Sequence, residues 1–508
     1  MHRALQIPEM VDLICSQVSP DEDSASTRVL ARLARTAKIF LDPALNSLWS
    51  SLCSFLPFLG CMPADLWCLP VQTGDIYRLN LVRPIVPADW DRPLFYLNRG
   101  KSLEATLEPE FPCEEVFAAL CMSLPTEHFF PNLRRLDWIY MSFSVFPYLR
   151  TLLSPRLTRL GLHLTTTVSH LSLVPTIAHR CPYLTEVTIT CQSVPPPFHS
   201  QLRTSVSLLV RGLQHIEKLD ITDLDEHAFM HLGSLPTFKS LVLENFIDIP
   251  SFRYDHSDGF PALTNLELWP NTLKDGTSCI MSLTPNRLKT LAITVECEST
   301  FPEVAALFRA IADNIPHTGL TYLEIEINDS RDDDGILPSA LPDGVIEHDL
   351  LRRTLCHFGH LTYAELQIPG ALEITDVLVL ELARAWPDVE QLHLNNHRFS
   401  TRCSVTLNAL RALAEHCPKL TTLGLQLDAR VIPRAQNSVM QTNLRSLYVG
   451  FSPILDPPGV GGFLFGTFPA LTEIEVPSYP TFGENHAATA YCKSWRLLKA
   501  QMTAITAF

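Results

Sequence analysis

Three short segments of the chain contain residue types that could do chemistry. The acidic run DDDG at 332–335 has the carboxylates of a calcium-binding loop. Aligned on its glycine, however, such a loop would begin at Ser330 and end at Leu341, where a bidentate Glu is required. The sequence therefore predicts an exposed loop at 328–344, inserted in one repeat, rather than a calcium site.

The other two segments are CHFGH at 356–360 and GVGGFLFG at 459–466. The first brings a thiol and two imidazoles together, but a four-coordinate metal site would need a further, distant ligand. The second follows prolines rather than a strand and lacks the Lys-Ser/Thr pair of a phosphate-binding loop. With no GxSxG sequence and no pairing typical of a nucleophile and its base, we expect no catalytic residues, metal or cofactor. The sequence favours a binding protein over an enzyme.

The overall composition limits the partners. The 508 residues include 54 acidic and 39 basic side chains, a formal net charge of −15, which argues against binding to nucleic acid or to an anionic membrane. An uncharged stretch at 44–64 is interrupted by Pro57 and Pro63 and is amphipathic, so we expect no membrane span there. Fourteen cysteines without a C-x-x-C pair favour a reducing compartment, the cytoplasm or the nucleus.

A repeated sequence pattern, L-x-x-L-x-L, predicts the strands that would position any binding residues. We call each occurrence a phrase, and it occurs thirteen times. The phrases begin at residues 131, 155, 181, 214, 236, 260, 286, 318, 359, 386, 417, 442 and 468. Their mean spacing of about 28 residues lies within the range of leucine-rich repeats. Helical patterns at 300–315, 372–386 and 404–417 alternate with the phrases.

This pattern predicts an α/β fold, an irregular leucine-rich-repeat solenoid with parallel strands on the concave face and helices and loops on the convex face. Alternate strand residues should point into the core. We expect the solenoid over 131–508, with its start, including an irregular first strand near 102–108, in the linker segment 70–130. Residues 1–69 should form a separate helical domain.

The outward strand positions are predominantly acidic. These positions hold ten acidic and three basic residues. The acids are Asp137, Glu186, Asp220, Glu244, Glu267, Glu324, Glu326, Glu365, Glu473 and Glu475, and the bases are Arg135, Arg159 and Lys218. Trp269, Tyr322, Tyr363 and Tyr448 add the aromatic residues that are enriched in interfaces. We predict that a protein substrate of basic character binds at Glu244, Glu267, Trp269, Tyr322, Glu324, Glu326, Tyr363 and Glu365. The alternative is that the acidity only keeps the chain soluble.

Three helices are expected before the repeats. Ile7, Met10, Val11, Ile14 and Val18 lie at helical spacing in the first, which has Pro8 in its first turn. A second follows the acidic spacer 19–27 and contains Leu30, Leu33, Ala34, Ala37 and Phe40 on one face. Asp42-Pro43 should then turn the chain into a third, with Leu45, Leu48 and Trp49.

This N-terminal unit resembles an F-box domain, and the whole chain resembles the F-box and leucine-rich-repeat proteins, especially the expanded group of mushroom-forming fungi. Ile7-Pro8 matches the family's opening Leu-Pro, Glu9 its Glu, and Asp42-Pro43-Ala44-Leu45 its Asp-Pro-x-Leu step. The resemblance implies contacts with an Skp-type adaptor through Ile7, Pro8, Met10, Val11, Ile14, Leu30, Leu33, Phe40, Pro43, Leu45 and Trp49.

The function that the resemblance implies is substrate recognition in a cullin-RING ubiquitin ligase of the SCF type. The F-box would bind the Skp-type adaptor and thereby the cullin complex, and the repeats would bind a protein substrate. The alternative is a leucine-rich-repeat scaffold or inhibitor, whose N-terminal helices only cap the open end of the solenoid.

Overall fold

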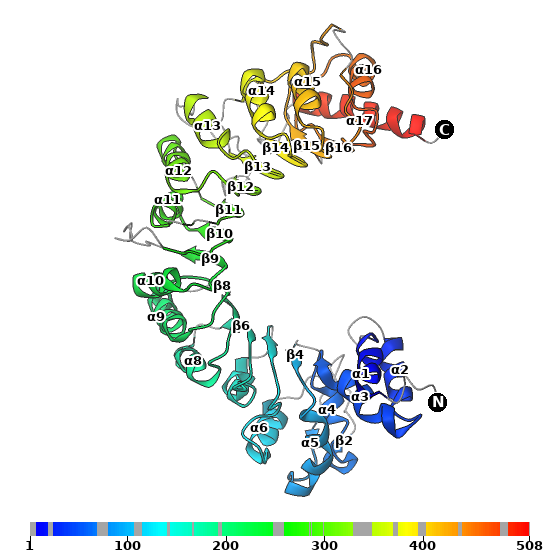
Figure 1. The fold of residues 1–508 in the computed structure, drawn as a ribbon, viewed down its shortest axis with the longest axis vertical. Helices are drawn as coiled ribbons and strands as arrows, with labels where there is room; N and C mark the ends of the chain where they lie inside the picture. Colours follow the sequence, from blue (N-terminus) through cyan, green and yellow to red (C-terminus); the bar gives the residue numbers. More distant parts are fainter. Residues whose placement is uncertain are drawn as a thin grey trace. The chain divides into compact units, whose positions relative to one another are not determined.

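The computed structural model describes residues 7–18, 24–68, 80–105, 114–139, 143–164, 167–191, 196–246, 259–283, 285, 287–297, 299–328, 348–368, 374–394, 403–434, 439–477 and 486–506. The acidic run at 332–335, which we predict to lie in an inserted loop, falls outside these residues. The chain forms two compact units, Met1–Thr237 and Phe238–Phe508. Figure 1 shows the ribbon, coloured along the sequence from blue at the N-terminus to red at the C-terminus.

Parallel strands follow one another in chain order in each unit. In unit 1 they are β1 (Ser51–Leu52), β4 (Ser102–Ala105), β5 (Arg135–Trp138), β6 (Arg159–Leu164), β7 (Glu186–Cys191) and β8 (Lys218–Ile221). In unit 2 they are β9 (Ser240–Phe246), β10 (Asn265–Pro270), β11 (Thr290–Val295), β12 (Tyr322–Ile327), β13 (Tyr363–Gln367), β14 (Gln391–Leu394), β15 (Thr422–Leu425), β16 (Ser446–Tyr448) and β17 (Glu473–Glu475). Each of the thirteen L-x-x-L-x-L phrases contains one strand, β5 to β17, which confirms the predicted α/β repeat fold.

Burial alternates along the strands as the phrase predicts. In β12 the side chains of Leu323, Ile325 and Ile327 are buried, while the residues between them are partly exposed. Because side chains alternate in direction along a strand, one face of the sheet carries the core and the other carries the partly exposed residues. We call the second face the outward face. Matching registers such as Leu266 with Leu291 stack the leucines of successive repeats.

A ladder of threonines joins successive repeats, and the sequence analysis did not detect it. Thr264 Oγ1 donates to the Lys239 carbonyl at 3.1 Å, and Thr321 Oγ1 donates to the Lys289 carbonyl at 3.2 Å. The other members are Thr158, Thr185, Thr362, Thr421 and Thr472, each donating to a backbone carbonyl of the preceding repeat. In these seven repeats the Thr of the Leu-Thr pair adds a side-chain hydrogen bond to a carbonyl that also accepts backbone amides of the same repeat.

Helices make the return segments. In unit 1 these are α6 (Glu114–Ser123), α7 (Val168–Leu171), α8 (Ile177–Arg180), α9 (Pro196–Gly212) and α10 (Glu226–Ser234), with 3₁₀ segments η4 (Phe143–Thr151) and η5 (Val174–Thr176). In unit 2 they are α11 (Leu273–Met281), α12 (Phe301–Asn314), α13 (His348–Leu355), α14 (Asp376–Ala385), α15 (Leu407–His416), α16 (Pro457–Thr467) and α17 (His486–Thr506). In unit 2, Figure 1 shows α11 to α14 on one side of β10 to β14. Among the described residues, no helix combines the length and apolarity that a membrane span requires.

The N-terminal helices are α1 (Pro8–Ser16), α2 (Ser24–Leu33) and α3 (Lys38–Ser50), and α1 and α2 both pack against α3. The predicted turn at Asp42-Pro43 is wrong, because Pro43 lies inside α3 and the chain turns at Ala34–Ala37 instead. Phe40 and Ala44, one helical turn apart, are both buried in the core of these helices. This burial offsets the backbone hydrogen bond that a proline removes.

The parallel sheet includes two strands ahead of the thirteen phrases. β1 lies within the segment predicted as a separate helical domain, and it pairs with β4 through Leu52 and Leu103. β4 coincides with the expected irregular strand near 102–108 but is the second strand of the sheet, not the first. β1 has only two residues, so it is too short to show the alternation that identifies a strand in a sequence.

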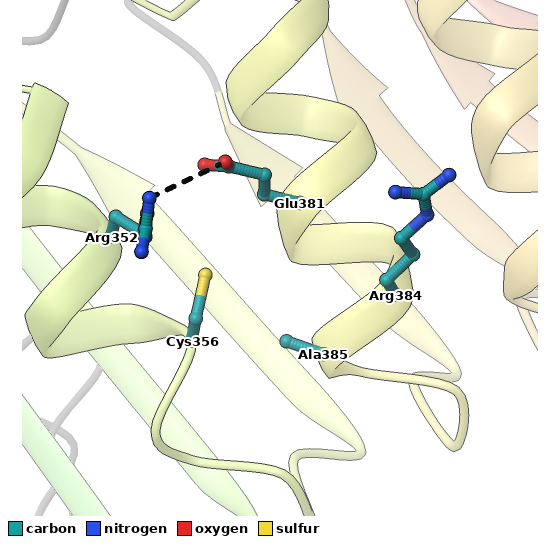
Figure 2. A pocket seen from close by; sticks show the side chains of 5 residues that line it. All are labelled: Arg352, Cys356, Glu381, Arg384 and Ala385. Atoms are coloured by element: carbon teal, nitrogen blue, oxygen red, sulfur yellow. Dashed lines mark ion pairs between the residues drawn. The ribbon is translucent and has the colours of Figure 1, made fainter.

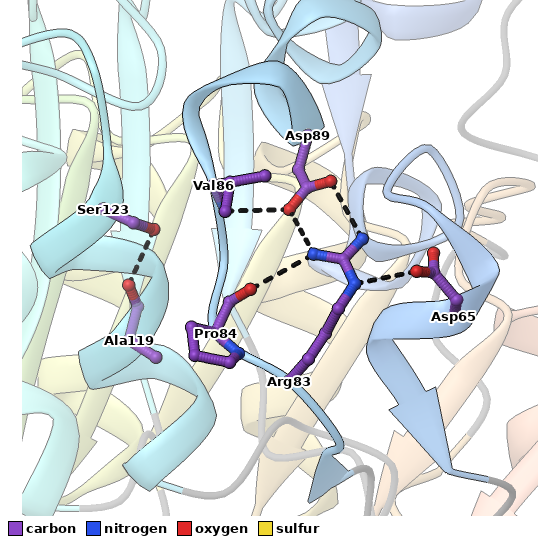
Figure 3. Close-up of polar contacts among 7 residues, drawn as sticks. All are labelled: Asp65, Arg83, Pro84, Val86, Asp89, Ala119 and Ser123. Carbon is purple, nitrogen blue, oxygen red and sulfur yellow. Dashed lines mark hydrogen bonds and ion pairs between the residues drawn. The ribbon is translucent and has the colours of Figure 1, made fainter.

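An ion-pair network joins Asp65, Arg83 and Asp89 among the described residues between β1 and β4. Here α4 (Leu56–Leu59), η2 (Ala64–Leu66), η3 (Pro87–Trp90) and α5 (Asp91–Leu97) accompany a small antiparallel pair, β2 (Trp67–Cys68) and β3 (Asn80–Leu81). Arg83 contacts both oxygens of the buried Asp89 carboxylate at 2.8 and 3.0 Å, and it contacts Asp65 at 2.7 Å (Figure 3). The Asp89 carboxylate also accepts a hydrogen bond from the Val86 amide at 2.9 Å.

Figure 3 also shows a hydrogen bond within α6, which the Ser123 hydroxyl donates to the Ala119 carbonyl.

We predict that this network makes stability depend on acid pH. The Arg83 hydrogen bonds lower the pKa of Asp89 below its ordinary value of 3.8. A depressed pKa stabilises the fold fully above the unfolded-state value, and this contribution is lost as the pH falls through the folded-state value. We expect Asp89→Asn to lower the melting temperature at pH 7, with the difference from wild type shrinking below about pH 4. Thermal unfolding across pH 2–7 measures this; a constant difference would contradict it.

Candidate functional site

The outward face of unit 2 carries a row of acidic residues that Ala292 interrupts. Strand register places Glu267 of β10 beside Ala292 of β11, Ala292 beside Glu324 of β12, and Glu324 beside Glu365 of β13. Glu365 in turn lies beside His393 of β14. Since neighbouring strands are about 4.8 Å apart, three of the predicted substrate-binding carboxylates share one band across β10–β13.

A parallel row of tyrosines lies two residues earlier on the same strands. Tyr322 and Tyr363 stack with ring centroids 4.2 Å apart and planes 3° from parallel. The Tyr322 hydroxyl donates to the Glu324 carboxylate, and the Tyr363 hydroxyl donates to the Glu365 carboxylate. The two Tyr-Glu pairs thereby fix the direction of their carboxylates.

Burial and mutual repulsion affect the titration of this cluster. Partial burial raises the pKa of Glu324 above its ordinary value; the Tyr322 hydrogen bond opposes this, and neighbouring carboxylates, Glu365 foremost, add to it. Burial and the adjacent carboxylates also raise the tyrosine pKa values, so both phenols stay protonated at neutral pH. The carboxylate cluster is therefore held together at an electrostatic cost that a bound cation would relieve.

The remaining predicted substrate residues lie on the same face. Trp269 follows Glu267 by two residues on β10 and is 43% exposed, and it pairs in register with Glu244 of β9. Burial raises the pKa of Glu244. Glu326 accepts a hydrogen bond at 2.9 Å from Asn328. Alternation thus places the eight predicted residues on one face of one unit, and whether they bind a substrate stays a prediction.

The outward face of unit 1 differs in charge. All three bases of the sequence count lie there, and each is in an ion pair: Arg135 with Asp137 at 2.6 Å, Arg159 with Glu186 at 2.7 Å, and Lys218 with Glu186 at 3.2 Å. No residue of β9 to β17 is Lys or Arg. Within the thirteen phrases, the three outward bases of unit 1 balance its three outward acids, and the acid excess lies in unit 2.

The eleven predicted adaptor residues divide by exposure. Ile7, Pro8, Met10 and Ile14 are exposed, while Leu33, Pro43 and Leu45 are half-buried. Val11, Leu30, Phe40 and Trp49 are buried: the first three build the core of the N-terminal helices, and Trp49 stacks on Tyr96 of α5 at 4.6 Å. In the free chain these four side chains therefore serve internal packing, and whether any of the eleven residues contacts an adaptor stays a prediction.

Three exposed residues of α1 and its N-cap residue Ile7 form an apolar surface. Ile7, Met10, Leu13 and Ile14 are 48, 41, 55 and 40% exposed, at the three- and four-residue spacing of one helix face. Val11 and Cys15 of the same helix are buried in the core with α3. Leu13 belongs to this surface although the motif comparison did not select it; its helical spacing from Met10 was the available signal.

The segment CHFGH does not bring its ligand atoms together. Cys356 lines a cavity of about 340 Å³ between α13 and α14, with Arg352, Glu381, Arg384 and Ala385 (Figure 2). Arg352 and Glu381 form an ion pair at 4.0 Å, and burial raises the pKa of the Cys356 thiol. His357 instead contacts the carbonyl of Arg353. Over the part of the chain that the structure describes, no three His, Cys, Asp or Glu side chains could hold a metal ion.

The glycine-rich segment 459–466 lies in helix α16 and serves packing. A β-carbon at Gly461 would lie 2.7 Å from Leu498 Cδ1 of α17, and one at Gly459 would collide with the Asp456 carboxylate. Asp456 caps the helix by accepting the Gly459 amide at 3.1 Å. These two glycines therefore allow close contact, a role that the sequence pattern alone did not reveal.

Comparisons with known proteins give fold likenesses only. No protein-family model and no curated protein matches the chain. Among solved structures, an internalin (inlF) from Listeria monocytogenes is 14% identical over 69% of this chain and 82% of its own, with a TM-score of 0.34. The Rad7 and Elc1 complex in yeast is 14% identical over 94% of this chain and 91% of its own, with a TM-score of 0.37. The TLR13-ssRNA13 complex is 13% identical over 80% of this chain and 60% of its own, with a TM-score of 0.32. The repeat architecture itself rests on the strands and registers described above.

Proposed function

We propose that this chain is the substrate-recognition subunit of a cullin-RING ubiquitin ligase of the SCF type. In this proposal the N-terminal helices bind an Skp-type adaptor and the repeats bind a protein substrate. The protein is then a non-enzymatic receptor of the cytoplasm or nucleus that needs no cofactor. The observation that carries the proposal is the apolar surface of α1, formed by Ile7, Met10, Leu13 and Ile14.

This surface has the properties of a contact site. Its four large apolar side chains are between 40 and 55% exposed on a helix whose other side is held in a core. Contiguous exposed apolar groups of this kind mark interaction sites, because burying them against a partner releases water. The position of this surface at the start of an F-box-like unit supports an adaptor as the partner.

The binding test uses the full-length chain and a purified Skp-type adaptor. We expect Met10→Glu combined with Ile14→Asp to weaken adaptor binding at least tenfold, because both charges fall within the apolar contact. The matched control is Met122→Glu on α6, where the side chain is 86% exposed and lies outside the N-terminal helices. Calorimetric titration measures the affinities, and circular dichroism checks that each variant remains folded.

Failure of the wild-type chain to bind the adaptor would overturn the proposal and favour a scaffold or inhibitor with a helical cap. One observation favours this second candidate. Asp42 of α3 pairs with Arg99 at 2.6 Å, and Trp49 stacks on Tyr96, so α3 is fixed to the segment leading into β4. A helix docked in this way covers the beginning of a repeat array, as terminal caps must.

A further inference from the structure

One position on the outward face of unit 2 has a short side chain between two long acidic ones. Ala292 of β11 pairs in register with Glu267 on one side and with Glu324 on the other. The two glutamate backbones are therefore separated by two strand spacings, about 10 Å. Only a methyl group lies between the two glutamates at this level of the sheet, so no long side chain of β11 separates them.

The two strands that flank β11 each carry an aromatic residue two positions from the glutamate in register with Ala292. Tyr322 precedes Glu324 by two residues on β12 and is held by its stack on Tyr363. Trp269 follows Glu267 by two residues on β10 and exposes 43% of its surface. A large aromatic residue that stays exposed on a strand face, beside hydrogen-bonded carboxylates, is characteristic of a recognition surface rather than of a solubilising one. We call Glu267, Trp269, Ala292, Tyr322 and Glu324 together the Ala292 site.

The carboxylates of the site are ordered before any ligand binds. Glu267 accepts a hydrogen bond at 3.0 Å from Asn265, and Glu324 accepts one from the Tyr322 hydroxyl. The strands β9 to β17 contribute no Lys or Arg, whereas the bases of the unit 1 strands pair with acids of their own sheet. The strands therefore concentrate negative charge at this site without neutralising it.

We propose that the Ala292 site binds an arginine side chain of a protein partner. A guanidinium group is planar, forms paired hydrogen bonds with carboxylates and stacks on aromatic rings, so it matches all three features of the site. A lysine ammonium could meet the charge but would not use the aromatic faces in the same way. The proposal rests on the proposed function only for the identity of the partner, which is then a ubiquitination substrate with an exposed arginine.

The first test fills the site without changing its charge. The probe is a fluorescent deca-arginine peptide, measured by anisotropy at 150 mM salt with the full-length chain. We expect Ala292→Leu to weaken binding at least tenfold. The matched control is Thr422→Leu on β15, an outward position between the uncharged Gln391 and Ser446, and it should leave binding unchanged. Equal effects of the two leucines, or none, would overturn the proposal.

The second test separates this site from the general acidity of unit 2. Glu267→Gln combined with Glu324→Gln removes two charges at the Ala292 site, and Glu473→Gln combined with Glu475→Gln removes two charges at β17. We expect at least a tenfold loss for the first pair and less than a twofold loss for the second. Equal losses, or equally tight binding of deca-lysine, would show diffuse charge attraction and overturn the proposal. Adaptor binding through α1 is measured separately, so a failure here leaves the ligase proposal standing.

Discussion

Replacing Leu266 with Asp should unfold the repeats. Leu266 is fully buried on β10 and pairs in register with Leu241 and Leu291, so the carboxylate would have no solvent and no basic partner. Removing a charge from water without a partner is among the most costly substitutions, and we expect a loss of more than about 4 kcal/mol in the free energy of unfolding. Urea denaturation followed by circular dichroism measures the change.

The adjacent residue provides the control for this variant. Glu267 lies next in sequence but on the outward face, and Glu267→Gln should change stability by no more than about 0.5 kcal/mol. Leu423 of β15, also fully buried, should respond to Asp as Leu266 does. Similar destabilisation by Glu267→Gln and Leu266→Asp would contradict the assignment of inward and outward positions.

The strand positions could be predicted from the sequence because one physical rule fixes them. A strand with one buried face must alternate apolar and polar residues. In a repeat protein this alternation recurs at the same place in every repeat, so thirteen phrases that are each weak evidence for a strand support one another. Where the repetition stops, the prediction weakens. β1 has two residues, and the Arg83–Asp89 contact joins residues whose proximity depends on the folded path of an irregular segment.

The predicted binding residues show a different limit. Helical periodicity identifies apolar residues but does not say which of two faces meets the core, so Val11 and Ile14 were grouped although one is buried and the other exposed. The strand charges show the same limit. A count of charged residues at the outward strand positions combines two different units. In unit 1, Arg159 pairs with Glu186, whereas the strands of unit 2 contain no base. The acid excess lies in unit 2 because its strands contain no base, and a total over the whole chain does not separate the two units.

The C-terminal helix α17 should contribute strongly to stability through Trp495. Its indole is fully buried and donates to the Ser452 carbonyl at 2.8 Å, beside the last strands of the sheet. Trp495→Ala would leave a cavity and an unsatisfied carbonyl, and we expect a loss of about 3–5 kcal/mol. Trp495→Phe keeps most of the volume and should cost about 1–3 kcal/mol, mainly through the lost hydrogen bond.

The position of this loss along the chain is as informative as its size. Each repeat contacts mainly its neighbours, so removing the contact at one end should destabilise β16 and β17 first and leave β10 to β12 protected for longer. Hydrogen exchange resolved along the chain measures this order. The control Leu497→Ala, on the same helix but 62% exposed, should leave exchange unchanged. Uniform loss of protection across unit 2 in Trp495→Ala would show instead that the repeats unfold as one cooperative block, with α17 stabilising all of them equally.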